Sequence, residues 1–131
     1  MTSNIDRRID EARTRISRVD VVTAHRLRDE GALFVDTRPE HQREAHGRIP
    51  GAIWIERNHI EWRLDPTSGH RDARAESHEG PIVVFCQEGY ASTLAVESLA
   101  DLGVPDIHDL DGGYAAWAAA GRPIELPHDV R

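Results

Sequence analysis

Short apolar runs separated by amphipathic segments set the pattern of the chain. The clearest run extends from Ile82 to Phe85 and contains no polar residue. A run of this kind is typical of a strand that is buried on both faces of a sheet. Together the runs predict strands at residues 18–19, 32–36, 53–56, 82–85 and 106–110.

Between these runs, apolar residues recur three or four positions apart, which is the spacing of one face of a helix. This spacing predicts helices at residues 4–16 and 92–102 and a short helix before Pro66. Residues that begin or end helices predict further helices at 21–30 and 39–45 and a last helix that ends at Gly121. Strands that alternate with helices form mostly parallel sheets. The sequence therefore predicts an α/β fold, with a mostly parallel five-stranded sheet and helices on both faces.

The pattern divides the chain into one domain with two short flanking segments. We expect residues 1–16 to form a charged helical extension that packs on the outside of the domain, with partner binding as the alternative. We expect residues 17–124 to form the domain and residues 125–131 an extended, partly disordered tail. Residues 67–80 are polar and rich in turn-forming residues, so they predict a surface loop.

Charge and composition narrow the possible partners and compartment. The formal charge of −7 argues against nucleic acid, because proteins that bind it carry basic patches. No window approaches the roughly 20 apolar residues of a membrane span, and no segment resembles a signal peptide. The single cysteine excludes a disulfide within the chain, which favours the cytoplasm over an oxidising compartment.

That cysteine, Cys86, lies between the strand at 82–85 and the helix at 92–102. Gly89 allows the intervening loop to curl, so that backbone N–H groups at the start of the helix point inward and form an anion cradle. Such a cradle favours the thiolate, which is the nucleophilic form of cysteine. The order of strand, cysteine, glycine loop and helix therefore indicates a reactive residue. An inert cysteine buried at a strand end is the alternative.

The same stretch resembles the active loop of the rhodanese-like sulfurtransferases. The six-residue loop, 86–91, begins with the cysteine and is closed by Ser92 at the start of the helix. Three further motifs of this family follow the expected order: FVDTR at 34–38, GRIPGAI at 47–53 and DGGYAAW at 111–117. Four motifs in the expected order identify the fold with high specificity, but they identify the activity less specifically.

The resemblance implies a bacterial enzyme that transfers sulfane sulfur in two steps. Cys86 takes the outer sulfur of a small anionic donor such as thiosulfate, or of a protein persulfide, and becomes a persulfide. A thiol or cyanide acceptor then removes this sulfur. The resemblance implies no cofactor and no metal. The loop would bind the substrate and stabilise the persulfide's charge with its N–H groups, as an oxyanion hole does; its members are Gln87, Glu88, Gly89, Tyr90, Ala91 and Ser92.

The loop departs from the family pattern in its charges. Many active members carry Arg or Lys at one of the last two loop positions, where this chain has Tyr90 and Ala91. Glu88 adds a carboxylate, so a dianion such as thiosulfate should be attracted less strongly. The real donor could instead be less anionic.

Three arginines are candidates to compensate for the missing loop cation: Arg38, Arg57 and Arg63. Arg38 follows a strand that should end at the same sheet edge as Cys86, where ligands of open α/β sheets bind. The resemblance favours a structural role for Arg38 and for Asp36 beside it. Arg57 and Arg63 belong to a segment that borders the active-site mouth in similar proteins, with a solvated surface arginine as the alternative for each.

Two other functions compete with sulfur transfer. A rhodanese-like binding or regulatory module would use the loop for recognition only. A cysteine phosphatase or arsenate reductase would require an arginine six residues after the nucleophile to hold the oxyanion. Because that position is Ser92, the sequence gives this second alternative little support.

Overall fold

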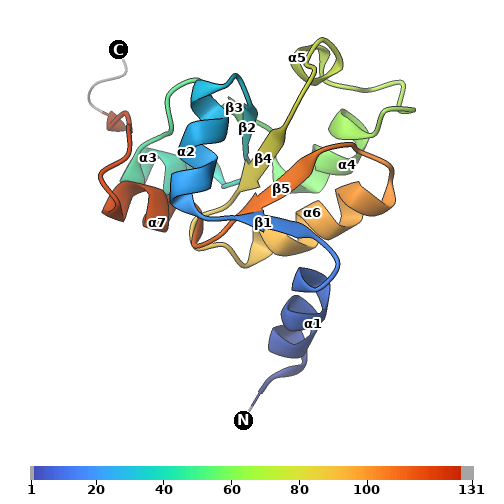
Figure 1. Cartoon of the computed structure of the whole chain (residues 1–131), viewed down its shortest axis with the longest axis horizontal. Helices are drawn as coiled ribbons and strands as arrows, with labels where there is room; N and C mark the ends of the chain where they lie inside the picture. The colour runs from blue at the N-terminus through green and yellow to red at the C-terminus, as the bar shows by residue number, and fades with distance from the viewer. Residues whose placement is uncertain (1, 128–131) are drawn as a thin grey trace.

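The apolar runs form the strands of a single sheet in the computed structural model, which describes residues 2–127 (Figure 1). The strands are β1 (Ser17–Val19), β2 (Leu33–Asp36), β3 (Ile53–Trp54), β4 (Ile82–Phe85) and β5 (Ile107–Leu110). Their order in the sheet is β1-β5-β4-β2-β3, and every neighbouring pair is parallel. The predicted α/β fold with a parallel five-stranded sheet is confirmed.

Helices connect the strands and cover both faces of the sheet (Figure 1). They are α1 (Asn4–Arg13), α2 (Val21–Asp29), α3 (Glu40–His46), α4 (Ile60–Leu64), α5 (Ala73–Glu76), α6 (Ala91–Asp101) and α7 (Gly113–Ala119), and a 3-10 turn, η1 (Arg57–His59), precedes α4. Among the described residues, no helix combines the length and the apolar character that crossing a membrane requires.

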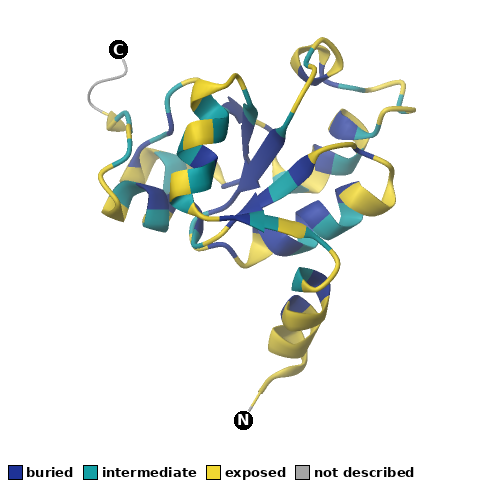
Figure 2. Cartoon of the chain, in the orientation of Figure 1, coloured by how far each residue is buried: buried dark blue, intermediate teal, exposed yellow. Residues whose placement is uncertain are grey.

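Side-chain alternation along β4 divides the hydrophobic core into two clusters. Ile82 and Val84 contribute to one cluster, beneath α4 and α6, while Val83 and Phe85 contribute to the other. The second cluster includes Tyr114 and Trp117 of α7, which are 2% and 0% exposed. A strand that is apolar on both faces is thus explained by a sheet that is covered on both sides, as the dark strands of Figure 2 show.

The parallel arrangement brings the ends of β2 and β4 to one edge of the sheet. Asp36 is in register with Phe85, and the Thr37 hydroxyl donates to the Phe85 carbonyl at 2.9 Å. Cys86 therefore follows β4 directly beside the residues that follow β2. The predicted proximity of these two segments is confirmed.

One predicted segment differs from the structure, and the start of the predicted tail pairs with the domain. Residues 67–80 are not entirely a loop, because the Asp72 carboxylate accepts from the Arg74 N–H and caps the short helix α5. Ile124, the last residue of the predicted domain, packs against the second core cluster, and Glu125, the first residue of the predicted tail, exchanges two backbone hydrogen bonds with Arg48. The contacts of Ile124 and Glu125 join residues that are distant in the sequence, so local sequence patterns do not reveal them. The remainder of the predicted tail, residues 128–131, lies outside the described residues.

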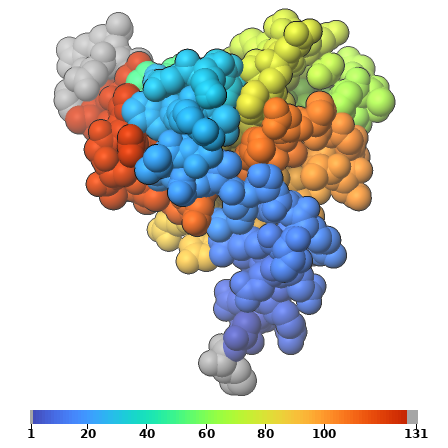
Figure 3. Space-filling view, viewed as in Figure 1, coloured from blue at the N-terminus to red at the C-terminus, as the bar shows by residue number. Residues whose placement is uncertain are grey.

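Helix α1 projects from the body of the molecule (Figures 1 and 3). It is N-capped by Ser3, and most of its surface is exposed (Figure 2). Its inner end packs against α6. Ile9 and Ala12 are 5% and 0% exposed, so these two apolar residues form the surface by which α1 attaches to the domain.

Candidate active site

The sulfur of Cys86 lies at the base of the loop that joins β4 to α6. The residue is 8% exposed, and its Sγ accepts hydrogen bonds from the N–H groups of Gly89 at 3.2 Å and Ser92 at 3.3 Å. The third contact is with the Ser92 hydroxyl, whose oxygen lies 3.3 Å from Sγ and accepts the S–H. Two inward N–H groups at a helix start form the kind of cradle that stabilises an anionic sulfur.

The loop rests on the turn between β5 and α7. The N–H groups of Tyr114 and Ala115 donate to the carbonyls of Cys86 and Gln87, each at 2.9 Å. This contact requires glycine: a Cβ at Gly113, where φ is +60°, would lie 2.5 Å from the Cys86 carbonyl oxygen. A Cβ at Gly89, where φ is +87°, would lie 2.9 Å from the Gly112 nitrogen. The DGG motif therefore supports the loop from below.

Beneath Ser92 lies a buried carboxylate that the sequence analysis did not single out. Asp109 of β5 is 0% exposed and accepts from the hydroxyls of Ser92 and Thr93, each at 2.6 Å. Its ion-pair partner is Arg18 of β1, at 3.0 Å, which also pairs with Asp111. The available signal was an aspartate inside the strand predicted at residues 106–110, since a buried charge requires a partner.

Arg38 is buried beside the loop rather than open to solvent. Its guanidinium donates to both oxygens of Asp36, to the Gly47 carbonyl at 2.7 Å, and to the Gln87 side-chain oxygen at 3.0 Å. It also stacks over the Tyr114 ring, 4.1 Å from the ring centroid, and burial raises the pKa of that phenol. Asp36 thus holds the Arg38 guanidinium in place, and Arg38 holds the side chain of Gln87.

A different arginine contacts the loop from outside. Arg13, at the end of α1, donates to the Gly89 carbonyl at 2.9 Å, and its guanidinium lies 5.5 Å from the centre of the Tyr90 ring. Arg18 approaches the same carbonyl at 3.5 Å. Sequence spacing could not reveal Arg13, because the contact joins residues 76 positions apart. The other loop side chains, Glu88, Tyr90 and Ala91, are exposed.

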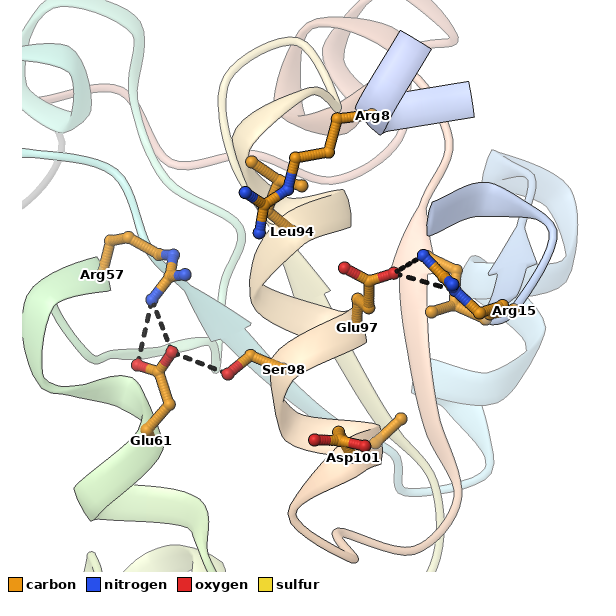
Figure 4. A pocket seen from close by; sticks show the side chains of 10 residues that line it. Arg8, Arg15, Arg57, Glu61, Leu94, Glu97, Ser98 and Asp101 are labelled. Carbon is orange, nitrogen blue, oxygen red and sulfur yellow. Dashed lines mark hydrogen bonds and ion pairs between the residues drawn. The ribbon is translucent and has the colours of Figure 1, made fainter. Parts of the chain in front are cut away.

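Arg57 and Arg63 line two separate cavities, and neither cavity includes the Cys86 loop. Arg57 lines a groove of about 790 Å³ between α1, α6 and η1, where it pairs with Glu61 at 3.0 Å (Figure 4). Arg63 donates to the His70 carbonyl at 3.0 Å and lines a smaller cavity next to Asp72. Both arginines already have partners, and neither cavity is lined by the loop residues 86–91. Among the described residues, no cluster of three metal-ligating side chains occurs.

The fold and the cysteine loop together define a class of protein, and comparison with known proteins identifies it. The family model for the rhodanese-like domain matches residues 20–120. The chain therefore belongs to the rhodanese-like domain family.

Individual relatives agree with this assignment. The thiosulfate sulfurtransferase GlpE of Stutzerimonas stutzeri A1501 is 30% identical over 116 residues, which cover 88% of this chain and 96% of that protein. A thiosulfate sulfurtransferase of Pseudomonas aeruginosa is 25% identical, with a TM-score of 0.68, over 85% of this chain and 19% of its own.

A third relative carries a different description. RPA3614 of Rhodopseudomonas palustris CGA009 is 30% identical, with a TM-score of 0.85, over 95% of this chain and 96% of its own. Its structure is described as that of a protein of unknown function and possible tyrosine phosphatase.

Replacing Gly113 by alanine tests the support of the loop. We expect Gly113→Ala to lower the free energy of unfolding by more than about 2 kcal/mol. An alanine with a positive φ costs about 1–2 kcal/mol, and here its Cβ also clashes with the Cys86 carbonyl. Urea titration measures the loss. The matched control is Gly103→Ala, where φ is +87° but no atom lies within 4 Å of the added Cβ. Equal losses in the two variants would contradict a specific contact with the loop.

Replacing Arg13 by alanine tests the contact from α1. We expect Arg13→Ala to increase hydrogen exchange at the loop amides about tenfold, because the Gly89 carbonyl loses a charged donor worth about 1.5 kcal/mol. The control is Arg15→Ala on the same segment, which removes the exposed ion pair with Glu97 and has no contact with the loop. If both variants exchange alike, Arg13 does not hold the loop.

Proposed function

We propose that this protein is a sulfurtransferase that carries sulfane sulfur as a persulfide on Cys86. The observation that carries the proposal is the pair of N–H groups, from Gly89 and Ser92, that point at Sγ. The names of the thiosulfate sulfurtransferase relatives support the same activity. We propose the residues of the loop, 86–92, as the site that holds the transferred sulfur.

In the first step the Cys86 thiolate attacks the outer sulfur of the donor. With thiosulfate, a bond forms between Sγ and that sulfur, the sulfur–sulfur bond of the donor breaks, and sulfite leaves with its electron pair. The persulfide keeps one negative charge, which the loop N–H groups stabilise. In the second step an acceptor thiolate or cyanide attacks the terminal sulfur, and the Cys86 thiolate is the leaving group.

The charges around the loop favour a donor less anionic than thiosulfate. The exposed Glu88 repels anions, and the Arg13 guanidinium is engaged by the Gly89 carbonyl. Arg38 is 1% exposed, and Arg57 is held by Glu61. We therefore propose that a protein persulfide is a better donor than thiosulfate. We place the reaction in the cytoplasm of a bacterium, where a reducing environment keeps a lone thiol available.

Intact mass spectrometry tests the covalent step. After brief incubation with thiosulfate or an organic persulfide, we expect the wild type to gain roughly 32 Da, the mass of one sulfur atom, and to lose it on reduction. Cys86→Ser should show no gain. Absence of an adduct with either donor would contradict the proposal and favour a module that uses the loop only for recognition.

A charge substitution in the loop tests the electrostatic account. We expect Ala91→Arg to raise kcat/KM for thiosulfate about tenfold at low ionic strength, with a smaller gain in 0.5 M salt, because a loop cation attracts the dianion and salt screens it. Ala91→Gln is the control, since it adds a side chain without charge. If Ala91→Arg brings no gain at low salt, the charge of the loop is not what limits thiosulfate.

Phosphate ester hydrolysis is the second candidate, because the structural relative RPA3614 is described as a possible tyrosine phosphatase. A phosphatase of the Cys-x5-Arg type binds phosphoryl oxygens with a guanidinium six residues after the cysteine. Here Ser92 occupies that position, and its hydroxyl is held by Asp109. A buried carboxylate behind the loop also disfavours an incoming dianion. Turnover of an aryl phosphate that is lost in Cys86→Ser would establish this second function.

A further inference from the structure

A chain of two hydrogen bonds connects the sulfur of Cys86 to a buried carboxylate on another strand. The S–H lies 3.3 Å from the Ser92 oxygen, and that hydroxyl lies 2.6 Å from Oδ1 of Asp109. Ser92 has only one hydroxyl proton, which it can donate to the carboxylate or to the sulfur but not to both. At 2.6 Å from a carboxylate, the proton belongs to the bond with Asp109.

We propose that Asp109 is a positioning residue that controls the ionisation of Cys86 through the Ser92 hydroxyl. While Ser92 donates to Asp109, its lone pairs face Sγ and accept the S–H, so this arrangement stabilises the neutral thiol. When Cys86 loses its proton, those lone pairs face a negative sulfur. The hydroxyl must then turn toward Sγ, and Asp109 loses a donor. Asp109 and the thiolate therefore compete for one proton.

The surroundings keep the carboxylate in place for this competition. Arg18 of β1 binds Oδ2 at 3.0 Å, and the Thr93 hydroxyl lies 2.6 Å from the same oxygen. Oδ1 is thus left to Ser92. Further charged groups surround the loop: Asp111 pairs with Arg18, Arg13 contacts the Gly89 carbonyl, Arg38 holds Gln87, and Glu88 is exposed.

Asp109→Asn reverses the polarity of the chain without changing its shape. Arg18 can only donate, so the asparagine oxygen must face it, which places the amide N–H₂ against the Ser92 oxygen. Ser92 then accepts from Asn and donates its proton to Sγ. The substitution also removes a negative charge near the sulfur. Both effects stabilise the thiolate.

The rate of Cys86 alkylation by iodoacetamide, measured against pH, tests the proposal. We expect Asp109→Asn to shift the midpoint of this profile down by about one pH unit, which is about tenfold faster alkylation below the midpoint. Thr93→Ser is the matched control, because it changes a side chain beside Asp109 but keeps the hydroxyl that bonds to Oδ2, and we expect it to leave the midpoint in place. We expect most of the shift to disappear when Asp109→Asn is combined with Ser92→Ala, because only the effect of the removed charge then remains.

Three results would overturn the proposal. An upward shift in Asp109→Asn would make Asp109 a proton acceptor for the thiol. An unchanged midpoint would leave it a structural residue. A shift of the same size in the Ser92→Ala background would show that the charge of Asp109 acts on the thiol without the Ser92 hydroxyl.

A second measurement uses only the wild-type protein and therefore does not depend on the folding of Asp109→Asn. The carboxyl carbon resonance of Asp109 should move with the same midpoint as the alkylation profile, because Asp109 loses the Ser92 proton when Cys86 ionises. A resonance that stays constant through this range would contradict the competition. The proposal rests on the proposed function only in treating Cys86 as the reacting group. Because both readouts follow the thiol itself, a failure to form the persulfide would not affect them.

Discussion

A loop that points N–H groups at a sulfur must direct its carbonyl groups elsewhere, and each of these needs a donor. This requirement governs the structure around Cys86. The carbonyls of Cys86 and Gln87 accept from the first N–H groups of α7, and the Gly89 carbonyl accepts from Arg13. The close approach of the two glycine turns makes the first two bonds possible. The inward cradle thus depends on an outer layer of donors from distant elements.

The arginines beside the loop serve mainly to satisfy oxygen atoms. Arg38 holds a carboxylate and a carbonyl, Arg18 neutralises Asp109, and Arg13 supports Gly89. Guanidinium groups suit this work, because their several planar donors reach more than one acceptor at once. The charge that stabilises the sulfur comes instead from backbone dipoles. A site of this kind suits a sulfur anion with little additional charge.

The fold was predictable from sequence, because the central strand β4 is a continuous apolar run and the segments that form α1 and α6 have apolar residues at helical spacing. The parallel topology then placed Asp36 and Cys86 at one edge, as the structure confirms. Contacts between distant segments were not predictable: Arg13 meets Gly89 across 76 positions, and Ser92 meets Asp109 across 17. The sequence pattern also missed the short helix α5, which Asp72 caps within residues 67–80. The spacing of apolar residues along the chain specifies the helices and strands. Which side chains surround the site depends instead on the partners that each buried charge finds in distant segments.

The position of β5 has a consequence for the order of folding. This strand is the last in the chain, yet it lies between β1 and β4 near the middle of the sheet. Its pairing with β1 joins residues about 90 positions apart, and such non-local contacts form slowly. The turn that supports the loop follows β5 directly, and Asp109 is a residue of β5. The environment of Cys86 is therefore completed only when the end of the domain has been synthesised and docked. A nascent or truncated chain therefore holds Cys86 without the β5–α7 turn and the Asp109 carboxylate that lie beside it in the finished fold.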